Sequence, residues 1–429
     1  MNEMRRILFI ISVIFSLNAV YANEIYDEIK QNPNKAGGVY FAYPDTCYNV
    51  TPAPAGYKPF YISHIGRHGS RFLLKESDYT LPLKTLELAH GSNALTLKGE
   101  GVFEELTKLY DFAKLRAGDL TEKGVRQHKH IASRMFDAYP EVFSGNNVIT
   151  AHSTMVMRCA MSMAAFTESL KEKNPDLRVV REPSERNAKY INNPTPELAE
   201  YNKADGRWQT EYKELRNSTT PYERIIPEIF SDAAFIEEHV KPVNFTCQLY
   251  NVFAGMQNLD VENGFMNLFT DEELYKLWKI YNFRMYVHCS NCAYSNRVVL
   301  QNCIPLLNDM IERADAAIAD KRIGADLRFG HDLNIIPMTA LLGFDGCNHV
   351  VSDPEEICEV FQDYKISPMA SNIQMIFFRN EAEDVLVKFL LNEREISIPC
   401  KTDSFPFYRW SEVRPYLLGR LTTLTTESR

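Results

Sequence analysis

The stretch Pro-Phe-Tyr-Ile-Ser-His-Ile-Gly-Arg-His-Gly-Ser-Arg, residues 59–71, runs from an apolar segment into a basic turn. Residues 59–65 are rich in aromatic and β-branched side chains, which favour a β-strand. Two arginines, Arg67 and Arg71, then flank His68, and a glycine next to His68 is expected to let the backbone approach a ligand closely. Arginine presents a planar fork of donors that matches phosphate oxygens, and an imidazole between two such forks has a bound phosphorus within its reach. The stretch therefore predicts a phosphate site at the end of a strand.

A second segment joins a strand to a helix in the same way. The strand-like residues 147–149 are followed by residues 150–166, which carry a helical pattern. The apolar side chains that repeat at helical spacing, and are expected to pack, are Met155, Cys159, Met163 and Phe166. Ser153 or Thr154 is the expected cap of this helix, which places Arg158 about one turn inside it.

A third segment, residues 325–337, is another short apolar strand that runs into a helix, with His331 and Asp332 at the junction. In open α/β sheets, ligands bind beyond the carboxyl ends of the strands. Arg158, His331 and Asp332 all follow such ends. We therefore expect them to share one cleft with the basic turn at residues 67–71.

These segments resemble the histidine phosphatase superfamily, branch 2, which contains the histidine acid phosphatases. Residues 67–71 are similar to the family's signature Arg-His-Gly-x-Arg, and His331-Asp332 is similar to its second signature, His-Asp. Residues 120–128 are similar to the family's leucine-threonine-x-x-Gly helix start, with Thr121 as the expected N-cap. The segments also follow the order in which the family has them.

The resemblance implies a role for each side chain in the predicted cleft. His68 is the expected nucleophile, which attacks phosphorus to form a phosphohistidine, and Asp332 is the expected acid that protonates the departing alcohol. The side chains expected to hold the phosphoryl oxygens are Arg67, Arg71, Arg158 and His331. The resemblance implies no cofactor.

Within the family, the chain looks closest to bacterial multiple inositol polyphosphate phosphatases and phytases, and the resemblance extends over residues 54–399. It departs from the phosphatases of that group at one point. Their second signature typically ends His-Ala-Glu, whereas this chain has His331-Asp332-Leu333-Asn334, the ending usual for acid phosphatases and many phytases. The expected activity is hydrolysis of an inositol polyphosphate. The alternatives are a broad-specificity acid phosphatase, a phosphomutase and a non-catalytic protein that binds a phosphorylated ligand.

The order of strand-like and helical patterns predicts an α/β fold with a central mixed, largely parallel sheet and helices on both faces. Two late apolar runs, residues 370–378 and 385–392, are expected to form a hairpin. Residues 189–295 are polar and aromatic with helical patterning, and we expect them to form an inserted α-helical cap domain. The α/β core then consists of residues 23–188 and 296–429.

The beginning of the chain is typical of an exported protein. A basic start and an apolar run lead to small residues before a plausible cut after Ala22, so residues 1–22 are expected to be a cleavable signal peptide. The expected location is periplasmic or secreted. The apolar run is too short for a typical membrane span. The formal net charge of −9 argues against a nucleic-acid partner but not against a phosphorylated small molecule, because a net-acidic protein can still focus a positive field in one cleft.

An inositol polyphosphate carries phosphates that are not being cleaved, and these need additional positive charges. The residues considered for this role are Lys75, Arg181, Arg186 and Lys189.

Nine cysteines in a chain expected to be exported predict some disulfide bonds, with at least one thiol left over. No metal site is expected. Residues 288–292 contain a histidine and two cysteines but lack a second cysteine pair at zinc-finger spacing, and His128 and His130 face different directions on a helix.

Overall fold

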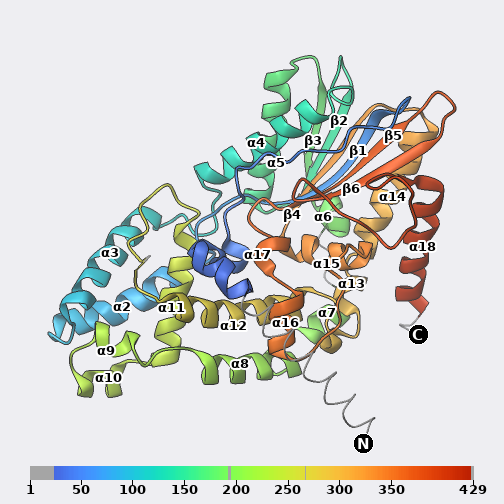
Figure 1. The fold of residues 1–429 in the computed structure, drawn as a ribbon. Helices are drawn as coiled ribbons and strands as arrows, with labels where there is room; N and C mark the ends of the chain where they lie inside the picture. The colour runs from blue at the N-terminus through green and yellow to red at the C-terminus, as the bar shows by residue number, and fades with distance from the viewer. Residues whose placement is uncertain (1–23, 192–194, 266, 427–429) are drawn as a thin grey trace, which may run out of the picture.

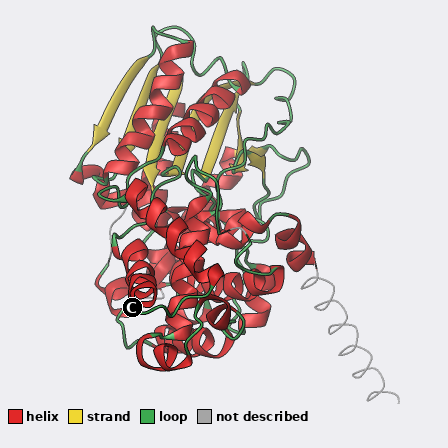
Figure 2. Cartoon of the chain, turned by 90° about the vertical axis from the view of Figure 1, so that its left-hand side faces the viewer, coloured by secondary structure: helices red, strands yellow, loops and turns green. Residues whose placement is uncertain are grey.

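The computed structural model describes residues 24–191, 195–265 and 267–426, and it shows a part built around a sheet beside an all-helical part (Figure 1, Figure 2). The expected signal peptide, residues 1–22, lies outside the described residues. Within the residues that are described, no helix is long and apolar enough to cross a membrane.

The sheet is mixed, with the strand order β3-β2-β4-β1-β5-β6-β7 and with β8 paired to β6. The strands are β1 (Lys58–Arg67), β2 (Val148–Ser153), β3 (Arg178–Pro183), β4 (Gly324–Gly330), β5 (Asn372–Arg379), β6 (Val385–Leu391), β7 (Arg394–Glu395) and β8 (Tyr408–Arg409). The first four strands pair in parallel, whereas β5 is antiparallel to β1 and forms an antiparallel hairpin with β6. The predicted sheet and its late hairpin are confirmed.

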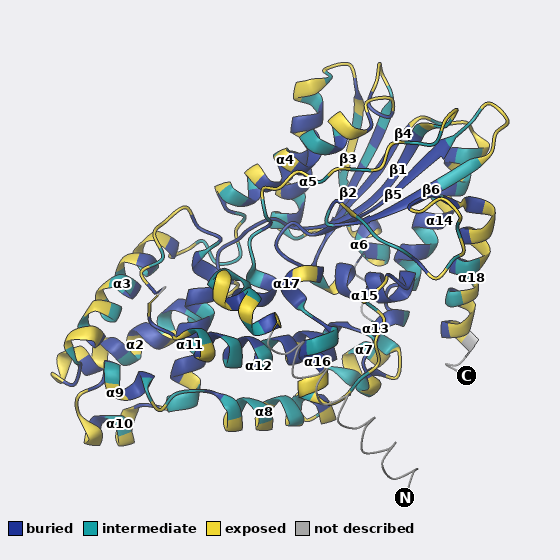
Figure 3. Cartoon of the chain, in the orientation of Figure 1, coloured by how far each residue is buried: buried dark blue, intermediate teal, exposed yellow. Residues whose placement is uncertain are grey.

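Helices cover both faces of this sheet (Figure 1). The helices over one face are α4 (Glu122–Ala138) and α5 (Met157–Lys173), and those over the other include α14 (Ile304–Ala319), α15 (Asp332–Leu342) and α18 (Trp410–Thr426). Along β1, Ile62 packs into the first layer, while Tyr61 and Ile65 pack into the second. This alternation follows from the two-residue period of a strand. Both faces of β1, β4 and β5 are consequently buried (Figure 3).

The remaining helices are mostly short. Their bounds are η1 (Pro33–Tyr40), α2 (Ser77–Gly91), α3 (Leu97–Ala113), α6 (Glu185–Ile191), α7 (Pro196–Tyr201), α8 (Arg207–Thr219), α9 (Ile225–Ile229), α10 (Ala233–His239), α11 (Pro242–Met256), α12 (Asp271–Cys289), η2 (Ala293–Ser295), α13 (Val298–Gln301), α16 (Pro354–Val360) and α17 (Asp363–Ile366).

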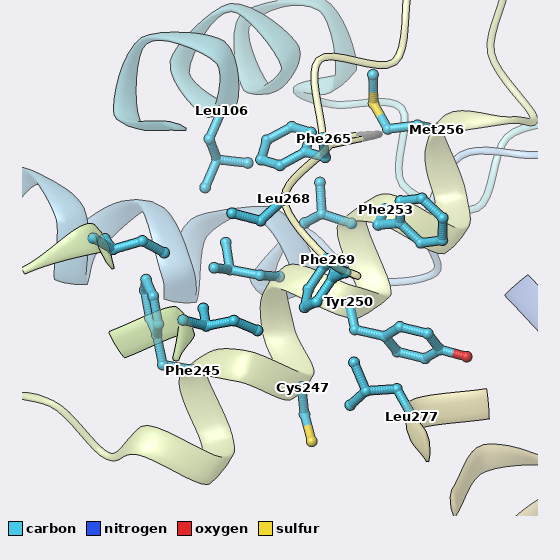
Figure 4. Packing of buried hydrophobic residues seen from close by; sticks show 14 of the residues in the cluster. Leu106, Phe245, Cys247, Tyr250, Phe253, Met256, Phe265, Leu268, Phe269 and Leu277 are labelled. Carbon is cyan, nitrogen blue, oxygen red and sulfur yellow. The ribbon is translucent and has the colours of Figure 1, made fainter. Parts of the chain in front are cut away.

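The all-helical part is held together by one hydrophobic cluster. Leu106 of α3, Phe253 of α11 and Leu277 of α12 belong to this cluster, and so does Phe265, which precedes α12 (Figure 4). Helices α2 and α3 therefore pack with α9–α12, although they precede residues 189–295 in the sequence by a long interval. The helical part takes in more of the chain than residues 189–295, and the division of the chain into domains at these positions stays a prediction.

The expectation of disulfide bonds is not met, because all nine cysteines have free thiols in the structure. The cysteines are spread over several hydrophobic clusters, and those that share a cluster also keep free thiols. Cys247 packs inside the helical part, Cys303 packs against the sheet, and Cys289 and Cys292 lie in a third cluster. Most of these thiols are buried and serve as small apolar side chains.

Candidate active site

The carboxyl ends of three parallel strands bring the predicted cleft residues together. β1 ends at Arg67, directly before His68, and its pairing with β4 sets Arg67 opposite Gly330, directly before His331. β2 ends shortly before α5, the helix that carries Arg158. The backbone N–H of His68 donates to the carbonyl of Gly330 at 3.0 Å, so the two signature segments are hydrogen-bonded to each other.

Gly69 is required by a close approach between two backbone segments. A Cβ atom at Gly69 would lie 2.7 Å from the Cα of Gly124 in α4, which leaves no room for any other residue. Thr121 caps α4 by accepting from the N–H of Gly124, as predicted, and its own backbone N–H and hydroxyl both donate to the Ser70 carbonyl. The glycine thus allows the turn at residues 67–71 to pack directly on the start of α4.

His68 is held in one tautomer and one protonation state. Its Nδ1 lies 2.9 Å from the carbonyl oxygen of Gly69, and because a carbonyl only accepts, Nδ1 carries the proton. Burial, followed by the positive charges of Arg67, Arg71, Arg158 and His331, lowers the pKa of His68 well below its usual value. The ring is therefore neutral near pH 7, with its lone pair on Nε2. A neutral imidazole with a free Nε2 is the form that can attack phosphorus.

Arg67 is fully buried and fixed by three acceptors. Its Nη1 donates to the carbonyls of Val39 at 2.6 Å and Ser367 at 2.7 Å, and its Nη2 donates to Oδ2 of Asp332 at 3.0 Å. Its Nε has no hydrogen-bond partner within the described residues. A buried guanidinium with an unpaired N–H is costly unless an anion completes its hydrogen bonds.

The other two arginines show the same feature. The Nε atoms of both Arg71 and Arg158 are buried and have no partner in the part of the chain that the structure describes. Arg71 is held by donating to the Phe72 carbonyl at 2.9 Å, and its guanidinium lies 4.9 Å from the ring centre of Tyr40. Three positive groups with unpaired donors around one neutral imidazole form a site suited to a phosphate dianion.

His331 and Asp332 complete the cleft from α15. The ring centres of His331 and His68 are 5.7 Å apart, and His331 Nε2 lies 3.4 Å from the hydroxyl of Thr154. Burial alone would raise the pKa of Asp332, but the charges of Arg67, His331 and Arg71 outweigh it and lower this pKa. With no anion in the cleft, the Asp332 carboxyl group is therefore ionised near pH 7; a bound phosphate dianion would offset the arginine charges and raise this pKa, as a general acid requires.

Two details of α5 differ from the sequence prediction. The helix begins at Met157 with Val156 as its N-cap, and neither Ser153 nor Thr154 caps it through a side chain. Met155 precedes the helix and is 59% exposed, so it does not join the packing stripe. The Thr154 hydroxyl is instead turned to His331, and the Ser153 hydroxyl donates to a neighbouring carbonyl. The Thr154 hydroxyl therefore contacts a cleft residue, and the Ser153 hydroxyl stabilises the turn between β2 and α5.

The additional basic residues separate into two groups. Arg181 donates to Thr167 at 2.7 Å, Arg186 is 79% exposed and paired with Glu182, and Lys189 is exposed. Within the described residues, none of these three makes a hydrogen bond or an ion pair with a cleft residue. Lys75 instead lines a cavity of about 350 Å³ that is also lined by Tyr40, the residue whose ring packs against the Arg71 guanidinium.

Two arginines of this cavity were not singled out from the sequence. Arg216 of α8 and Arg284 of α12 line it together with Lys75, Asp78 and Tyr40. Arg216 donates to Asn244 and Cys247, whereas the side chains of Lys75 and Arg284 have no hydrogen bond or ion pair within the described residues. Three cations and one carboxylate leave a net positive charge beside the cleft. Arg216 and Arg284 lie on helices that are distant in the sequence, so no local sequence motif predicts that both line this cavity.

No metal site accompanies these groups. Within the described ranges, no set of three or more His, Cys, Asp or Glu side chains is arranged to hold a metal ion. His128 is buried and His130 is exposed and bonded to Asp45 at 3.1 Å, which confirms that the two face different directions.

Buried histidines make the folded protein sensitive to acid. Burial lowers the pKa of both His64 and His128 to about 3, and that of His331 to about 4. Between pH 6.5 and these values, the unfolded chain binds a proton at each position that the folded chain does not bind. Folding stability therefore falls as the pH falls, by about 1.4 kcal/mol per pH unit for each such histidine.

We expect His128→Phe to weaken this dependence. His128 Nε2 has no partner and its ring contacts Phe166 and Phe329, so a phenyl ring fits the surroundings. The free energy of urea unfolding should change between pH 6 and pH 4 by about 1.4 kcal/mol per pH unit less in the variant than in the wild type. An unchanged dependence would show that His128 is protonated in the folded state.

The comparison with protein families agrees with this geometry. The family model described as histidine phosphatase superfamily (branch 2) matches residues 62–392, a range that includes both signature segments and Arg158. The chain belongs to this family. The expected family is confirmed, and with it the enzyme class, a phosphomonoesterase of the histidine acid phosphatase kind. A comparison with curated proteins found no match.

Solved structures of the family share the fold with this chain. A multiple inositol polyphosphate phosphatase of Bifidobacterium longum in complex with inositol hexasulfate matches with a TM-score of 0.74 and 16% identity, over 89% of this chain and 97% of that one. The phytase of D. castellii matches with a TM-score of 0.65 and 15% identity, over 90% and 85%. The phytase of Hafnia alvei matches with a TM-score of 0.53 and 12% identity, over 87% and 99%.

Proposed function

We propose that this member of the histidine phosphatase superfamily hydrolyses inositol polyphosphates through a phosphohistidine on His68, with Asp332 as the general acid. The observation that carries the proposal is the state of His68. Its ring is neutral, its Nδ1–H is bonded to the Gly69 carbonyl, and its Nε2 is left free among three arginines with unpaired Nε atoms. This is the arrangement that an in-line attack on a bound phosphate requires.

The reaction proceeds in two steps. A phosphate group bound by Arg67, Arg71, Arg158 and His331 is attacked at phosphorus by Nε2 of His68, the P–O bond to the alcohol breaks, and Asp332 gives its proton to the departing oxygen. Water then attacks the phosphohistidine and gives a proton to Asp332, and the P–N bond breaks to release inorganic phosphate and neutral His68. The enzyme must lower the barrier by roughly 20 kcal/mol or more, because uncatalysed phosphomonoester hydrolysis is extremely slow.

The cavity lined by Lys75, Arg216 and Arg284 supports a substrate with several phosphates. Tyr40 lines this cavity and its ring also packs against the Arg71 guanidinium, so the cavity and the cleft share a residue. Solved relatives bind inositol hexasulfate, an analogue that carries an anionic group on every ring carbon. We propose that this cavity binds phosphates that are not being cleaved. Arg186 and Lys189, which lack contacts with the cleft, are weaker candidates for the same role.

The double variant Lys75→Ala/Arg284→Ala is expected to raise KM for inositol hexakisphosphate about tenfold, because two charge-assisted contacts at a partly exposed site are lost. KM for an aryl phosphate should stay within about twofold, since its single phosphate occupies only the cleft. Steady-state kinetics on the two substrates provide the measurement.

The matched control is Lys84→Ala/Arg207→Ala. It removes the same total charge at exposed positions of α2 and α8 that do not line the cavity. If both double variants change KM equally, or if KM rises equally for both substrates, the cavity has no role in binding.

A broad-specificity acid phosphatase is the second candidate function. The His331-Asp332 ending of the second signature favours it, and such an enzyme would use the same cleft residues. Phosphate release from inositol hexakisphosphate and from an aryl phosphate, measured with a chelator present on protein beginning at Asn23, separates the two. A higher kcat/KM for the inositol compound supports the first proposal, whereas no advantage favours the second. If phosphate is released from neither substrate, a phosphomutase or a non-catalytic binding protein becomes the favoured interpretation.

We also propose that the protein is exported to the periplasm or beyond the cell. The proposal depends on the basic and apolar pattern of residues 1–22. N-terminal sequencing of protein recovered from the host tests it, since removal of the peptide leaves Asn23 as the first residue.

A further inference from the structure

Asp363, the first residue of α17, is a buried carboxylate outside the signature segments. It is 1% exposed, and each of its oxygens accepts one hydrogen bond at 3.0 Å. Oδ2 accepts from the backbone N–H of Val39 in η1, and Oδ1 accepts from the indole N–H of Trp278 in α12. Its backbone N–H donates to Asn282 of α12 at 3.0 Å. Three segments that are distant in the sequence thus meet at this carboxylate.

Asp363 is hydrogen-bonded to both residues whose carbonyls accept from Arg67. Val39, whose N–H is bonded to Asp363, accepts from Nη1 of Arg67 through its own carbonyl at 2.6 Å. Ser367 offers the other carbonyl to Nη1 at 2.7 Å, and its backbone N–H donates to the carbonyl of Asp363 at 2.8 Å. Both contacts of Nη1 therefore lead to Asp363, one through its side chain and one through its backbone.

The backbone next to Val39 is shaped around Asp363. Gly38 has φ of +56°, and a Cβ atom there would lie 3.1 Å from the carboxyl carbon of Asp363. Only a glycine permits this conformation together with this contact. The segment that presents the Val39 carbonyl to Arg67 is consequently packed directly on the carboxylate.

We propose that Asp363 is a positioning residue that fixes the guanidinium of Arg67 for phosphate binding. It does so by holding the carbonyls of Val39 and Ser367, which anchor Nη1 and leave Nε and Nη2 aimed at the phosphate and at Asp332. The inference depends on the proposed function, because it assigns to Arg67 the role of holding the phosphate that is cleaved. It adds a residue that lies in neither signature and that links the helical part to the chemistry.

The charge of Asp363 gives the proposal a sharp test. The titratable groups that interact with its charge are Arg67, Tyr250 and Tyr364, while Trp278 and Asn282 contact it as neutral donors. If Asp363 acted only through its negative charge near Arg67, neutralising it would strengthen anion binding. If it acts by positioning, the same change weakens anion binding. The asparagine amide has one oxygen where the carboxylate has two, so the N–H groups of Val39 and Trp278 no longer each have an acceptor.

The experiment measures competitive inhibition of aryl phosphate hydrolysis by inorganic sulfate, an anion that does not titrate between pH 5 and pH 8. For Asp363→Asn at pH 7.5, we expect sulfate to bind about tenfold more weakly, the factor given by loss of one hydrogen bond of ordinary strength. Burial raises the pKa of Asp363 to about 6, so the wild-type carboxylate itself becomes protonated below that pH. The difference in sulfate affinity between Asp363→Asn and the wild type should therefore become smaller as the pH falls below 6.

Asp326→Asn is the matched control. Asp326 is an equally buried aspartate on β4 that accepts from Tyr61 and pairs with Arg322, without contact to Arg67. Its replacement should lower stability and leave sulfate binding unchanged. If Asp363→Asn fails to fold, Trp278→Phe provides the test, since it removes one donor to the carboxylate and keeps the ring packing; sulfate should then bind about threefold more weakly.

Unchanged or tighter sulfate binding in a folded Asp363→Asn protein, or in Trp278→Phe where the first variant does not fold, would overturn the inference. So would an equal loss in Asp326→Asn. These outcomes differ from a failure of the proposed function, in which the wild type itself would not hydrolyse the aryl phosphate.

Discussion

Replacing His68 with alanine is expected to lower kcat for phosphomonoester hydrolysis by more than about a thousandfold. The variant loses the nitrogen that forms the bond to phosphorus, and the arginines alone can bind the phosphate but not cleave it. Within the described residues the ring makes one hydrogen bond, to the adjacent Gly69 carbonyl, so the fold should survive its loss. Turnover of an aryl phosphate and the thermal unfolding midpoint, measured on the same preparation, check both parts of this prediction.

His128→Phe is the matched control for this variant. His128 of α4 is also a buried histidine, but its ring contacts are with Phe166 and Phe329 and not with the signature residues. The His128→Phe variant should therefore retain wild-type turnover. Wild-type turnover in His68→Ala would remove His68 as the nucleophile. Equal losses in the two variants would mean that the loss comes from the fold and not from the chemistry.

Replacing Asp332 with asparagine is expected to affect substrates according to their leaving groups. Inositol hexakisphosphate releases an alkoxide that needs a proton, so its kcat/KM should fall by about 10² to 10⁴. An aryl phosphate releases a phenolate that is stable without one, so its loss should stay below about tenfold. The amide oxygen can still accept from Nη2 of Arg67, and any change in phosphate binding affects both substrates alike. The ratio of the two losses therefore isolates the proton transfer.

Asp309→Asn serves as the control for the Asp332 variant. Asp309 pairs with Arg328, a fully buried arginine like Arg67, but outside the cleft. Its replacement removes the negative charge paired with a buried guanidinium, as Asp332→Asn does, and should leave the ratio of the losses on the two substrates unchanged. Equal losses on both substrates in Asp332→Asn would exclude Asp332 as the acid.

The centre of the site was predictable from the sequence because its residues are local to strand ends. His68, Arg67 and Arg71 stand in one run of five residues, and His331 and Asp332 are adjacent. Parallel pairing of β1 with β4 then brings the two runs together without any further information. The same reasoning gave the sheet, its helices on both faces and the late hairpin.

Other parts of the site could not be predicted, because they depend on long-range packing or on backbone groups. Val39 and Ser367 contact Arg67 through carbonyls, which every residue possesses. From the sequence, Arg216 and Arg284 look like solvated positions on amphipathic helices; only the folded structure shows that both line one cavity with Lys75. Disulfides were expected from cysteine number and export, but pairing requires proximity, which a sequence does not contain.

The most direct test of the central claim is to trap the covalent intermediate. The wild-type enzyme is mixed with ³²P-labelled substrate for milliseconds, quenched in alkali, where a phosphoramidate survives, and digested for mass spectrometry. We predict a label that is stable in alkali, labile in acid and located on His68, and that is absent from His68→Ala. Full turnover with no trapped label, or with the label on another residue, would contradict the mechanism proposed for this protein.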